Sequence, residues 1–437
     1  MKSRTNSCRR FFSVRWVPNI AFALTLLLPF SSGKAQSGSL VSISELPAAL
    51  AKAHPGELLL IRNGTYPDRQ LSLSGSGQKD QSITLRAETP GGVILSGRSS
   101  IRIDGDWITL DGVLFSDGFS PRKEVISLSG SHCRLVNCVI DNYNPPDPDT
   151  DEKWVSLRGH HHVVEYCTFQ NKRSRGVTLT VWRDGNQADR HIILRNYFLD
   201  RPKGSASNGY ETIRIGTSDT SASDSLTAIS ENLFQRCDGE MEIISVKSGK
   251  NLIRDNTFLE CAGTLTLRHG NGSVVERNLF IGNRKKGTGG IRIFGAGHLI
   301  KDNSFIGTTG RAEAAIALMC GNPDPAPHEF EVARSIRIEG NLIAANEGPA
   351  LKFDTKYKSE NRTQLPEKIL IRANTLSGSE PATLVSGATI LRPGAVTWDR
   401  NQIFQQNQIP STITGKIAPP LNPADVGAPW FRGKVRK

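Results

Sequence analysis

The sequence predicts an all-β protein: a single-domain, right-handed parallel β-helix with a short N-terminal capping helix. Three observations predict it. A short motif recurs along the chain, the runs between its copies are rich in β-forming residues, and helical periodicity is almost absent. The motif is an asparagine followed two residues later by a large apolar residue, and it stands at Asn196, Asn232, Asn256, Asn278 and Asn303. Stacked coils of parallel strands fit this pattern, whereas leucine-rich and helical repeats do not.

Weaker copies of the motif extend the repeat in both directions, at Asn137, Cys167, Asn341, Asn374 and Asn401. The interval between copies ranges from 22 residues, between Asn256 and Asn278, to 38 residues, between Asn303 and Asn341. A constant coil that carries loops of variable length explains this range. We expect the asparagines and the apolar residues to form internal ladders, and we assign no chemistry to them.

The first 35 residues have the features of a secretory signal peptide. Basic residues precede an apolar run from Ile20 to Phe30, and small residues follow it up to Ala35. This pattern predicts cleavage after Ala35, with residues 1–35 as the signal peptide and 36–437 as the parallel β-helix domain. No cysteine closely follows the apolar run, which argues against a lipoprotein. We therefore expect a secreted or periplasmic protein.

The two ends of a solenoid must be covered, because exposed strand edges invite pairing with other chains. The sequence predicts one clear helix, at Ser44–His54, with Ser44 as its N-cap and with Pro55-Gly56 ending it. We expect this helix to cover the first coil. The proline-rich, aperiodic tail from about Phe404 is expected to pack on the last coils.

The formal charge of the chain is +12. Loss of the six basic residues of the signal segment would leave about +6, which suggests an acidic partner but also fits an ordinary solvated surface. For an exported protein an anionic polysaccharide is a more suitable partner than nucleic acid, and no later segment is apolar enough to span a membrane. We expect a monomer.

Six cysteines follow the signal segment, and none has the spacing of a zinc site. Cys237 and Cys261 each lie five residues after a motif asparagine, so they should occupy equivalent places in adjacent coils, about 4.8 Å apart. That separation allows a disulfide. A reduced, buried pair is equally compatible with the sequence.

Charged residues gather in four consecutive coils at the centre of the chain. Alignment on the motif stacks the strands that begin near Tyr210, Gly239, Thr264 and Gly289, and the strands carry Glu211, Arg214, Glu240, Glu242, Lys247, Arg268, His269 and Arg292. A ladder of salt bridges on a solvated face is one interpretation. The absence of such charges from the flanking coils favours a binding wall for a polyanion.

These residue types also suit one reaction, β-elimination of a 4-linked uronate polymer. Glu240 and Glu242 are two residues apart, so in an extended strand both side chains leave by the same face and can bind one hard cation. With Asn208 from the preceding coil they could hold Ca²⁺, which would neutralise the uronate carboxylate. Lys247 is the candidate base, and Arg268 could stabilise charge or return a proton to the leaving oxygen.

At these residues the chain resembles polysaccharide lyase family 6, which includes alginate lyases and chondroitinase B. The resemblance runs from about Leu40 to Ala317, and its motifs include NGYETIRIGTSD, GEMEIISVKSGKN, GTLTLRHGN and TGGIRIFGAGH. It implies Lys247 as base, Arg268 as acid, and a Ca²⁺ bound by Glu240, Glu242 and either Asn208 or Glu211.

The same resemblance implies substrate contacts at His269, Arg292 and Arg175. Alginate is the leading substrate it suggests. Chondroitin or dermatan sulfate is the alternative.

Two other classes of protein can share this fold. A non-catalytic polysaccharide-binding β-helix would explain the repeat and the charge, but it would not require Lys247 and Arg268 beside two glutamates. A glycoside hydrolase needs paired carboxylates at its cleft, and the candidates Asp149 and Asp151 lie in a polar, proline-rich loop. We therefore favour the lyase.

Overall fold

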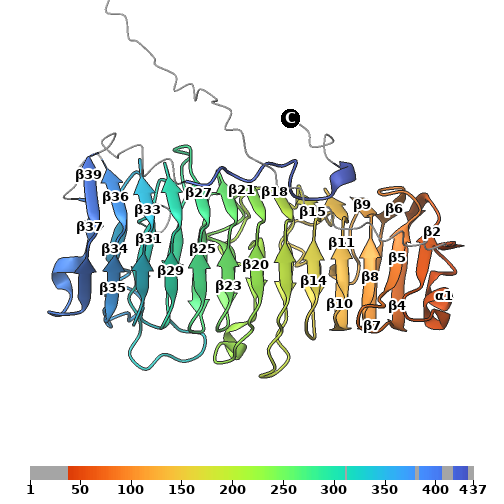
Figure 1. Ribbon diagram of the computed structural model, residues 1–437, viewed down its shortest axis with the longest axis horizontal. Helices are drawn as coiled ribbons and strands as arrows, with labels where there is room; N and C mark the ends of the chain where they lie inside the picture. Colours follow the sequence, from red (N-terminus) through yellow and green to blue (C-terminus); the bar gives the residue numbers. More distant parts are fainter. Residues whose placement is uncertain (1–37, 311–312, 379–382, 406–416, 432–437) are drawn as a thin grey trace, which may run out of the picture. The chain divides into compact units, whose positions relative to one another are not determined.

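The computed structural model describes residues 38–310, 313–378, 383–405 and 417–431, and its described part is a parallel β-helix. Three parallel sheets, here called A, B and C, run along the stack of coils (Figure 1). Each coil contributes one strand to each sheet, in the order C, A, B. The predicted fold class is confirmed.

Sheet A contains β1 Ser39–Val41, β2 Leu58–Ile61, β5 Ile83–Ala87, β8 Ile108–Asp111, β11 Arg134–Val136, β14 Val163–Glu165, β17 Ile192–Leu194, β20 Ala228–Ser230, β23 Leu252–Arg254, β26 Val274–Glu276, β29 Leu299–Lys301, β32 Arg337–Glu339, β35 Ile369–Arg372 and β38 Val396–Asp399. Sheet B contains β3 Gly64–Pro67, β6 Val93–Gly97, β9 Val113–Gly118, β12 Val139–Asp141, β15 Thr168–Gln170, β18 Tyr197–Arg201, β21 Leu233–Cys237, β24 Thr257–Leu259, β27 Leu279–Ile281, β30 Ser304–Ile306, β33 Leu342–Ala344, β36 Thr375–Gly378 and β39 Gln402–Gln405. Sheet C contains β4 Gln70–Ser76, β7 Ser100–Asp106, β10 Glu124–Ser131, β13 Lys153–Leu157, β16 Leu179–Val181, β19 Ile213–Ile215, β22 Glu242–Lys247, β25 Thr264–His269, β28 Ile291–Ile293, β31 Ile316–Met319, β34 Leu351–Thr355 and β37 Val385–Ser386.

The helical segments are short: α1 Leu46–Lys52 and the 3-10 turns η1 Ser218–Thr220, η3 Ala388–Ile390 and η4 Pro429–Phe431.

A ladder of asparagines follows the turn from sheet A to sheet B. One residue in left-handed conformation makes this turn, such as Asp255 at φ 56°, and the motif asparagine comes next. Asn256 accepts from the backbone N–H of Asn232 at 3.0 Å, and its amide donates to the carbonyl of Ile229 and to Asn278 Oδ1, each at 2.9 Å. The buried amides therefore satisfy one another from coil to coil, as predicted.

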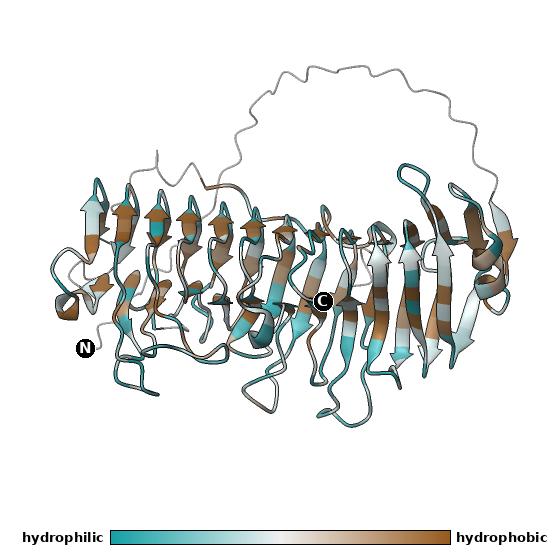
Figure 2. Cartoon of the chain, turned by 90° about the horizontal axis from the view of Figure 1, so that it is seen from below, coloured by the Kyte–Doolittle hydropathy of each residue, from teal (hydrophilic) through white to brown (hydrophobic). Residues whose placement is uncertain are grey.

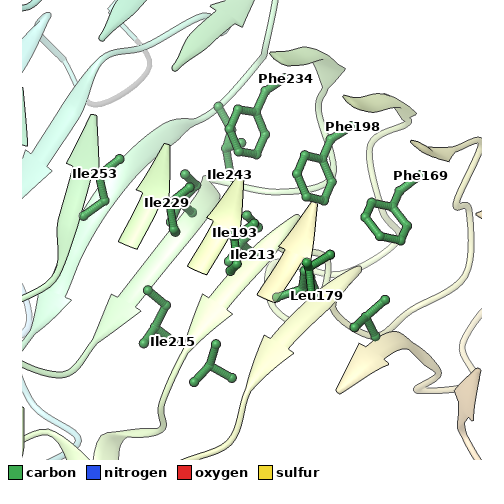
Figure 3. Close-up of a cluster of buried hydrophobic side chains, with 14 of the residues drawn as sticks. Phe169, Leu179, Ile193, Phe198, Ile213, Ile215, Ile229, Phe234, Ile243 and Ile253 are labelled. Atoms are coloured by element: carbon green, nitrogen blue, oxygen red, sulfur yellow. The ribbon is translucent and has the colours of Figure 1, made fainter. Parts of the chain in front are cut away.

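The core lies inside the three sheets and is layered in the same way. Phe169, Phe198, Phe234, Phe258 and Phe280 stack ring on ring, with centroids 4.6–5.2 Å apart, and three of these rings are labelled in Figure 3. In Figure 2 the apolar bands recur at the same level of successive strands. This repetition positions every coil, and it leaves the outward side chains of each strand free to carry function.

The ladder differs from the sequence prediction at its N-terminal end. Asn137 occupies the left-handed turn position, at φ 52°, and its amide donates to Asp111. The register of β11 with β14 puts Cys138 level with Cys167, and the backbone N–H of Cys167 donates to Asn196 Oδ1 at 2.9 Å. Cysteines therefore take the place of asparagine in these two coils.

The N-terminal helix is shorter than predicted, and its cap is different. α1 begins at Leu46, and Ser44 is not its N-cap; Glu45 takes that position without a capping side-chain bond. Instead, Ser42 Oγ and the Ser42 N–H both donate to the Glu45 carboxylate, at 2.6 and 3.1 Å, which fixes the turn before the helix. Leu46 and Leu50 are buried in the main core, so α1 does cover the first coil.

The described part of the C-terminal tail, residues 417–431, does not pack on the last coils. It runs back along the strands of sheet B (Figure 1). The N–H of Leu421 donates to Thr257 Oγ1, the N–H of Ala428 to Thr168 Oγ1, and Trp430 Nε1 to the carbonyl of Asn137. Apolar residues such as Val426 cover the outer side of sheet B there, which the tail's lack of periodicity could not show.

Residues 1–37 lie outside the described part, so the predicted signal peptide remains a prediction. None of the helices that the structure describes is long and apolar enough to cross a membrane.

All six cysteines of the described residues are buried free thiols. Cys237 and Cys261 do stack in adjacent coils, where the N–H of Cys237 donates to Cys261 Sγ at 3.4 Å. Burial raises the pKa of the Cys261 thiol well above its usual value. The structure therefore contains the reduced form of this pair.

Candidate active site on sheet C

The charged coils lie side by side in sheet C, on β19, β22, β25 and β28. Arg214 pairs with Ser245, Ser245 with Thr266, and Thr266 with Arg292. Their strand neighbours Ile213, Ile215, Leu265 and Leu267 belong to the core. This row therefore faces outward, and Lys247, two residues after Ser245, faces outward with it.

Two irregularities in the pairing of β22 with β25 set the site's geometry. Val246 pairs with Leu267 and Lys247 with His269, which leaves Arg268 as an extra residue. At the other end Ile243 is the extra residue between Glu242 and Ile244. Bulges of this kind redirect side chains next to active sites. They bring Lys247 beside His269, which residue spacing alone could not predict.

Glu240 does not lie on a strand, contrary to the reasoning that placed it two strand positions before Glu242. β22 begins at Glu242, and Glu240 precedes it in a bend. Glu240 is nevertheless buried, and its Oε2 accepts the N–H of Tyr210 at 3.0 Å. Burial, and next the negative charge of Glu211, raise its pKa to about 8; Glu242 raises it further and Lys247 lowers it. Glu240 therefore interacts electrostatically with both Glu211 and Glu242, although it reaches them from a bend rather than from a strand.

Lys247 and His269 stand at the centre of the group. The charge of Lys247 acts on both Glu240 and His269. His269 is buried, and Ser218 Oγ in η1 lies 3.2 Å from its Nε2. Burial, followed by the charge of Arg268, lowers the pKa of His269 to about 3. His269 is therefore neutral at physiological pH and can offer a hydrogen bond without adding charge.

Arg268 is held by a loop that sequence reasoning missed. Its Nη1 donates to the carbonyl of Glu329 at 2.9 Å and its Nη2 to that of His328 at 3.1 Å. Its guanidinium lies 4.1 Å from the centroid of the Phe330 ring. Burial is the main cause that lowers its pKa to about 10. Arg268 therefore remains charged at neutral pH, and its position depends on a segment some 60 residues away.

A second arginine shares this aromatic contact. The guanidinium of Arg362, which is buried, lies 3.4 Å from the centroid of the same Phe330 ring. Phe330 and Arg362 belong to long loops outside the repeating strands, so no motif marked them. The sequence signal was the length of two intervals between motif copies. Phe330 lies in the 38-residue interval from Asn303 to Asn341, and Arg362 lies in the 33-residue interval from Asn341 to Asn374.

Arg292 lies at the edge of the same group. Its Nη1 is 3.4 Å from Glu242 Oε1, and both side chains are mostly buried. This pair ties β28 to β22 across the intervening strand. It also gives Glu242 a counter-charge.

Asn208 and Arg175 lie on loops rather than in the strand group. Both are exposed, and Asn208 makes no hydrogen bond among the described residues. Arg175 packs against Gly209, where φ is +92° and an added Cβ would lie 3.1 Å from Arg175 Nε. Glu211, by contrast, is buried and acts electrostatically on Glu240. Of the two alternatives for a third metal ligand, Glu211 is the one that the structure puts beside the other carboxylates.

The chemistry of these donors fits a hard cation such as Ca²⁺. Glu211 Oε2 is buried without a hydrogen-bond partner, and Glu240 lies between two other carboxylates that disfavour its charge. The buried guanidinium of Arg201 offsets part of this charge, although it donates only to backbone carbonyls. Across the described ranges, no three His, Cys, Asp or Glu side chains are arranged to hold a metal by themselves. A bound cation would therefore need amide, water or substrate oxygens as well.

A cavity of about 1010 Å³ lies beside this site rather than over it. Asn322 and Glu331 line it, and they come from the same loop that holds Arg268. None of the predicted site residues lines it. The outer face of sheet C therefore remains the place where the predicted residues meet.

Fold and site together define a parallel β-helix protein with acidic and basic side chains concentrated on one sheet. The family model for chondroitinase B matches residues 40–393 of the chain. No curated protein sequence matches the chain. The chain belongs to the chondroitinase B family.

Solved structures agree with this assignment. The PL6 family alginate lyase AlyGC is 32% identical with a TM-score of 0.85; the similarity covers 92% of this chain and 60% of that one. A mannuronic acid-specific family 6 lyase from human gut microbiota is 28% identical, with a TM-score of 0.76 and coverage of 90% and 96%. The PL6 lyase Pedsa3628 from Pseudopedobacter saltans is 26% identical, with a TM-score of 0.79 and coverage of 90% and 99%. The chain thus spans about 60% of the length of AlyGC.

Proposed function

We propose that the protein is a polysaccharide lyase that cleaves a 4-linked uronate polymer, most suitably alginate, by β-elimination. The observation that carries the proposal is the meeting of Lys247, Arg268, His269 and the glutamates on one face of sheet C. The family and the alginate lyases among its solved relatives support the substrate class. Two further relatives are described as complexes with a trisaccharide and with G6, at 26% identity each.

In this proposal Lys247 takes the proton alpha to the uronate carboxylate, and the bond from C4 to the glycosidic oxygen breaks. The electron pair of the broken C–H bond becomes the new C4–C5 double bond. Arg268 stabilises the negative charge on the leaving oxygen and assists its protonation. His269, which is neutral, orients the substrate, and Arg292 and Arg175 contact its acidic groups.

Calcium is part of the proposal as a bound cofactor. Glu240 and Glu242 would hold it with Asn208 or Glu211, and when bound it would neutralise the uronate carboxylate. The buried, mutually repelling carboxylates support this assignment. The roles of the individual residues rest on their chemistry and on the family resemblance.

We also propose that the protein is exported to the periplasm or the medium, on the basis of the signal-like residues 1–35. An exported lyase can meet a polymer that is too large to enter the cell. We propose that it acts as a monomer.

The test is ultraviolet absorbance during incubation of the purified protein with alginate and, separately, with dermatan sulfate. Elimination produces a conjugated unsaturated uronate, whereas hydrolysis does not. We expect absorbance to rise on alginate, to vanish in Lys247→Ala, and to persist in Lys250→Ala. The last variant is a matched control, because Lys250 is exposed and paired with Asp224.

Dermatan sulfate is included because the family model carries the name of chondroitinase B. A rise on dermatan sulfate alone would replace alginate as the substrate. Binding of alginate without any rise on either polymer would contradict the lyase and indicate a polysaccharide-binding protein.

A further inference from the structure

The row of outward side chains at the proposed site continues far beyond it. The strand register joins the row from β4 to β34 without a gap, and its members are Ser72, Arg102, Ser127, Ser156, Thr180, Arg214, Ser245, Thr266, Arg292, Ala317 and Lys352. Every member is hydroxylic or basic except Ala317. Five of the hydroxylic members are buried, namely Ser127, Ser156, Thr180, Ser245 and Thr266. The basic members are accessible, so they are what this face of sheet C offers an acidic sugar along its length.

A second concave region lies on this face at β4, β7 and β10. Ser72, Ser100, Arg102 and Arg122 line a cavity of about 330 Å³. Ser100 is 2% exposed, and its Oγ has no hydrogen-bond partner in the described structure. A buried hydroxyl without a partner in a polar cavity indicates a missing ligand atom or water.

The arginines of this region have charge available for a ligand. Arg122 Nη1 donates to Ser72 Oγ at 3.2 Å, and Arg122 has no ion pair with any described residue. Arg102 contacts Asp104 at 3.2 Å, but both side chains are more than half exposed, so the pair is weak. The cavity's own acid, Glu124, is engaged by Arg158 at 2.9 Å. A carboxylate would therefore meet two available guanidiniums here.

Basic side chains connect this region to the proposed active site. Lys153, Arg158 and Arg214 surround the ring of Trp182, at 5.8, 5.1 and 5.1 Å from its centroid. β7 and β22 are five strands apart in sheet C, which separates Arg102 from the Lys247 strand by about 24 Å. Lys153 and Arg158 are paired with Asp151 and Glu124, at 2.7 and 2.9 Å, whereas Arg214 has no ion pair with any described residue. Several linked uronates could span that distance past Arg214.

We propose that the outer face of β4, β7 and β10 is a distal binding site for the uronate polymer. Arg102 and Arg122 would bind carboxylates of the same polymer that lies at Lys247, and the serine hydroxyls would bind its hydroxyl groups. The inference rests on the proposed function for the identity of the polymer. Its consequence is a preference for long chains, because a short oligosaccharide at Lys247 cannot reach Arg102.

The first experiment measures binding without turnover. Alginate binding of Lys247→Ala is compared with that of Lys247→Ala/Arg102→Ala/Arg122→Ala by affinity electrophoresis in gels that contain the polymer. We expect the apparent Kd to rise about tenfold, or about 1.4 kcal/mol. The matched control adds Arg62→Ala to Lys247→Ala, since Arg62 is an exposed arginine next to β2 in sheet A.

The second experiment measures chain-length preference in the active protein. The ratio of kcat/KM for polymeric alginate to kcat/KM for an alginate trisaccharide should fall about tenfold in Arg102→Ala/Arg122→Ala. Thermal unfolding of each variant checks that the fold is retained.

The outcomes separate the distal site from the lyase proposal. Suppose that the wild type cleaves alginate, and that the Arg102→Ala/Arg122→Ala substitutions change the polymer Kd and the kcat/KM ratio less than twofold. This result would overturn the distal site and leave the lyase proposal intact. Loss of affinity in the Arg62 variant equal to that of the arginine pair would also overturn it, because the effect would then be general charge. No cleavage of any uronate polymer, with binding that still depends on Arg102 and Arg122, would overturn the lyase and support the site.

Discussion

Affinity for the proposed Ca²⁺ should depend steeply on pH, because Glu240, a proposed ligand, must lose a proton before it can bind a cation. Its pKa is raised to about 8, mainly by burial and by the charge of Glu211. With that value about 1% of Glu240 is ionised at pH 6 and about half at pH 8. The apparent Kd for Ca²⁺ should therefore fall about 50-fold between pH 6 and pH 8.

The same titration affects stability in the absence of calcium. A carboxyl whose pKa is raised by folding stabilises the protein at low pH, and that contribution is lost as pH rises through about 8. The metal-free protein should therefore become less stable between pH 6 and pH 8. The increase in Tm on adding Ca²⁺ should be larger at pH 8 than at pH 6.

Isothermal titration calorimetry at the two pH values measures the affinities directly. In Glu240→Gln binding should weaken and the 50-fold pH effect should disappear, since glutamine does not titrate in this range. Glu231→Gln is the matched control, because Glu231 is half-exposed and pairs with Arg195 away from the site. A wild-type Kd that changes less than threefold between pH 6 and pH 8 would refute the reasoning.

Three other predictions concern the site loop, the ladder and the thiols. Phe330→Ala should lower kcat/KM on the substrate about 10- to 100-fold, because it releases Arg268. His328→Ala should not, since His328 contacts Arg268 only through its backbone carbonyl, and equal losses in the two variants would contradict this reasoning. Asn256→Ala should reduce the free energy of unfolding, measured by denaturant titration, by about 4 kcal/mol, because several buried groups lose their hydrogen-bond partner. Asn186→Ala, on an exposed loop, should change the free energy of unfolding little. Alkylation of the denatured protein without reductant should modify both Cys237 and Cys261 in full, and protection of the two thiols, seen by mass spectrometry, would indicate a disulfide instead.

The repeating part of this molecule could be predicted from sequence because each coil repeats the same physical requirement. A buried amide such as Asn256 needs a partner in the next coil, and a ring such as Phe258 needs another ring above it. These needs recur at matching positions, so the motif reveals the sheets and their register. Where cysteine replaces asparagine, at Cys138 and Cys167, the sequence does not fix the ladder position, and the prediction placed it at Asn137, one residue before Cys138.

The candidate site was predictable as a group but not in its geometry. Lys247, Arg268 and His269 were found because they sit on repeating strands. The bulge that makes Arg268 an extra residue depends on pairing, not on local sequence. The contacts from Glu329 and Phe330, and the path of the tail over sheet B, come from segments outside the repeat, where no periodicity fixes position.

The stack of coils gives the protein a built-in unit of length. Each coil adds one strand to sheet C, so any two places on its outer face are separated by whole steps of about 4.8 Å. Gain or loss of one coil between β10 and β19 would lengthen or shorten the span from Arg102 to Lys247 by one step and leave both local surroundings intact. Related proteins could therefore differ in the shortest polymer that contacts both sites through the number of coils alone, with the residues of each site unchanged.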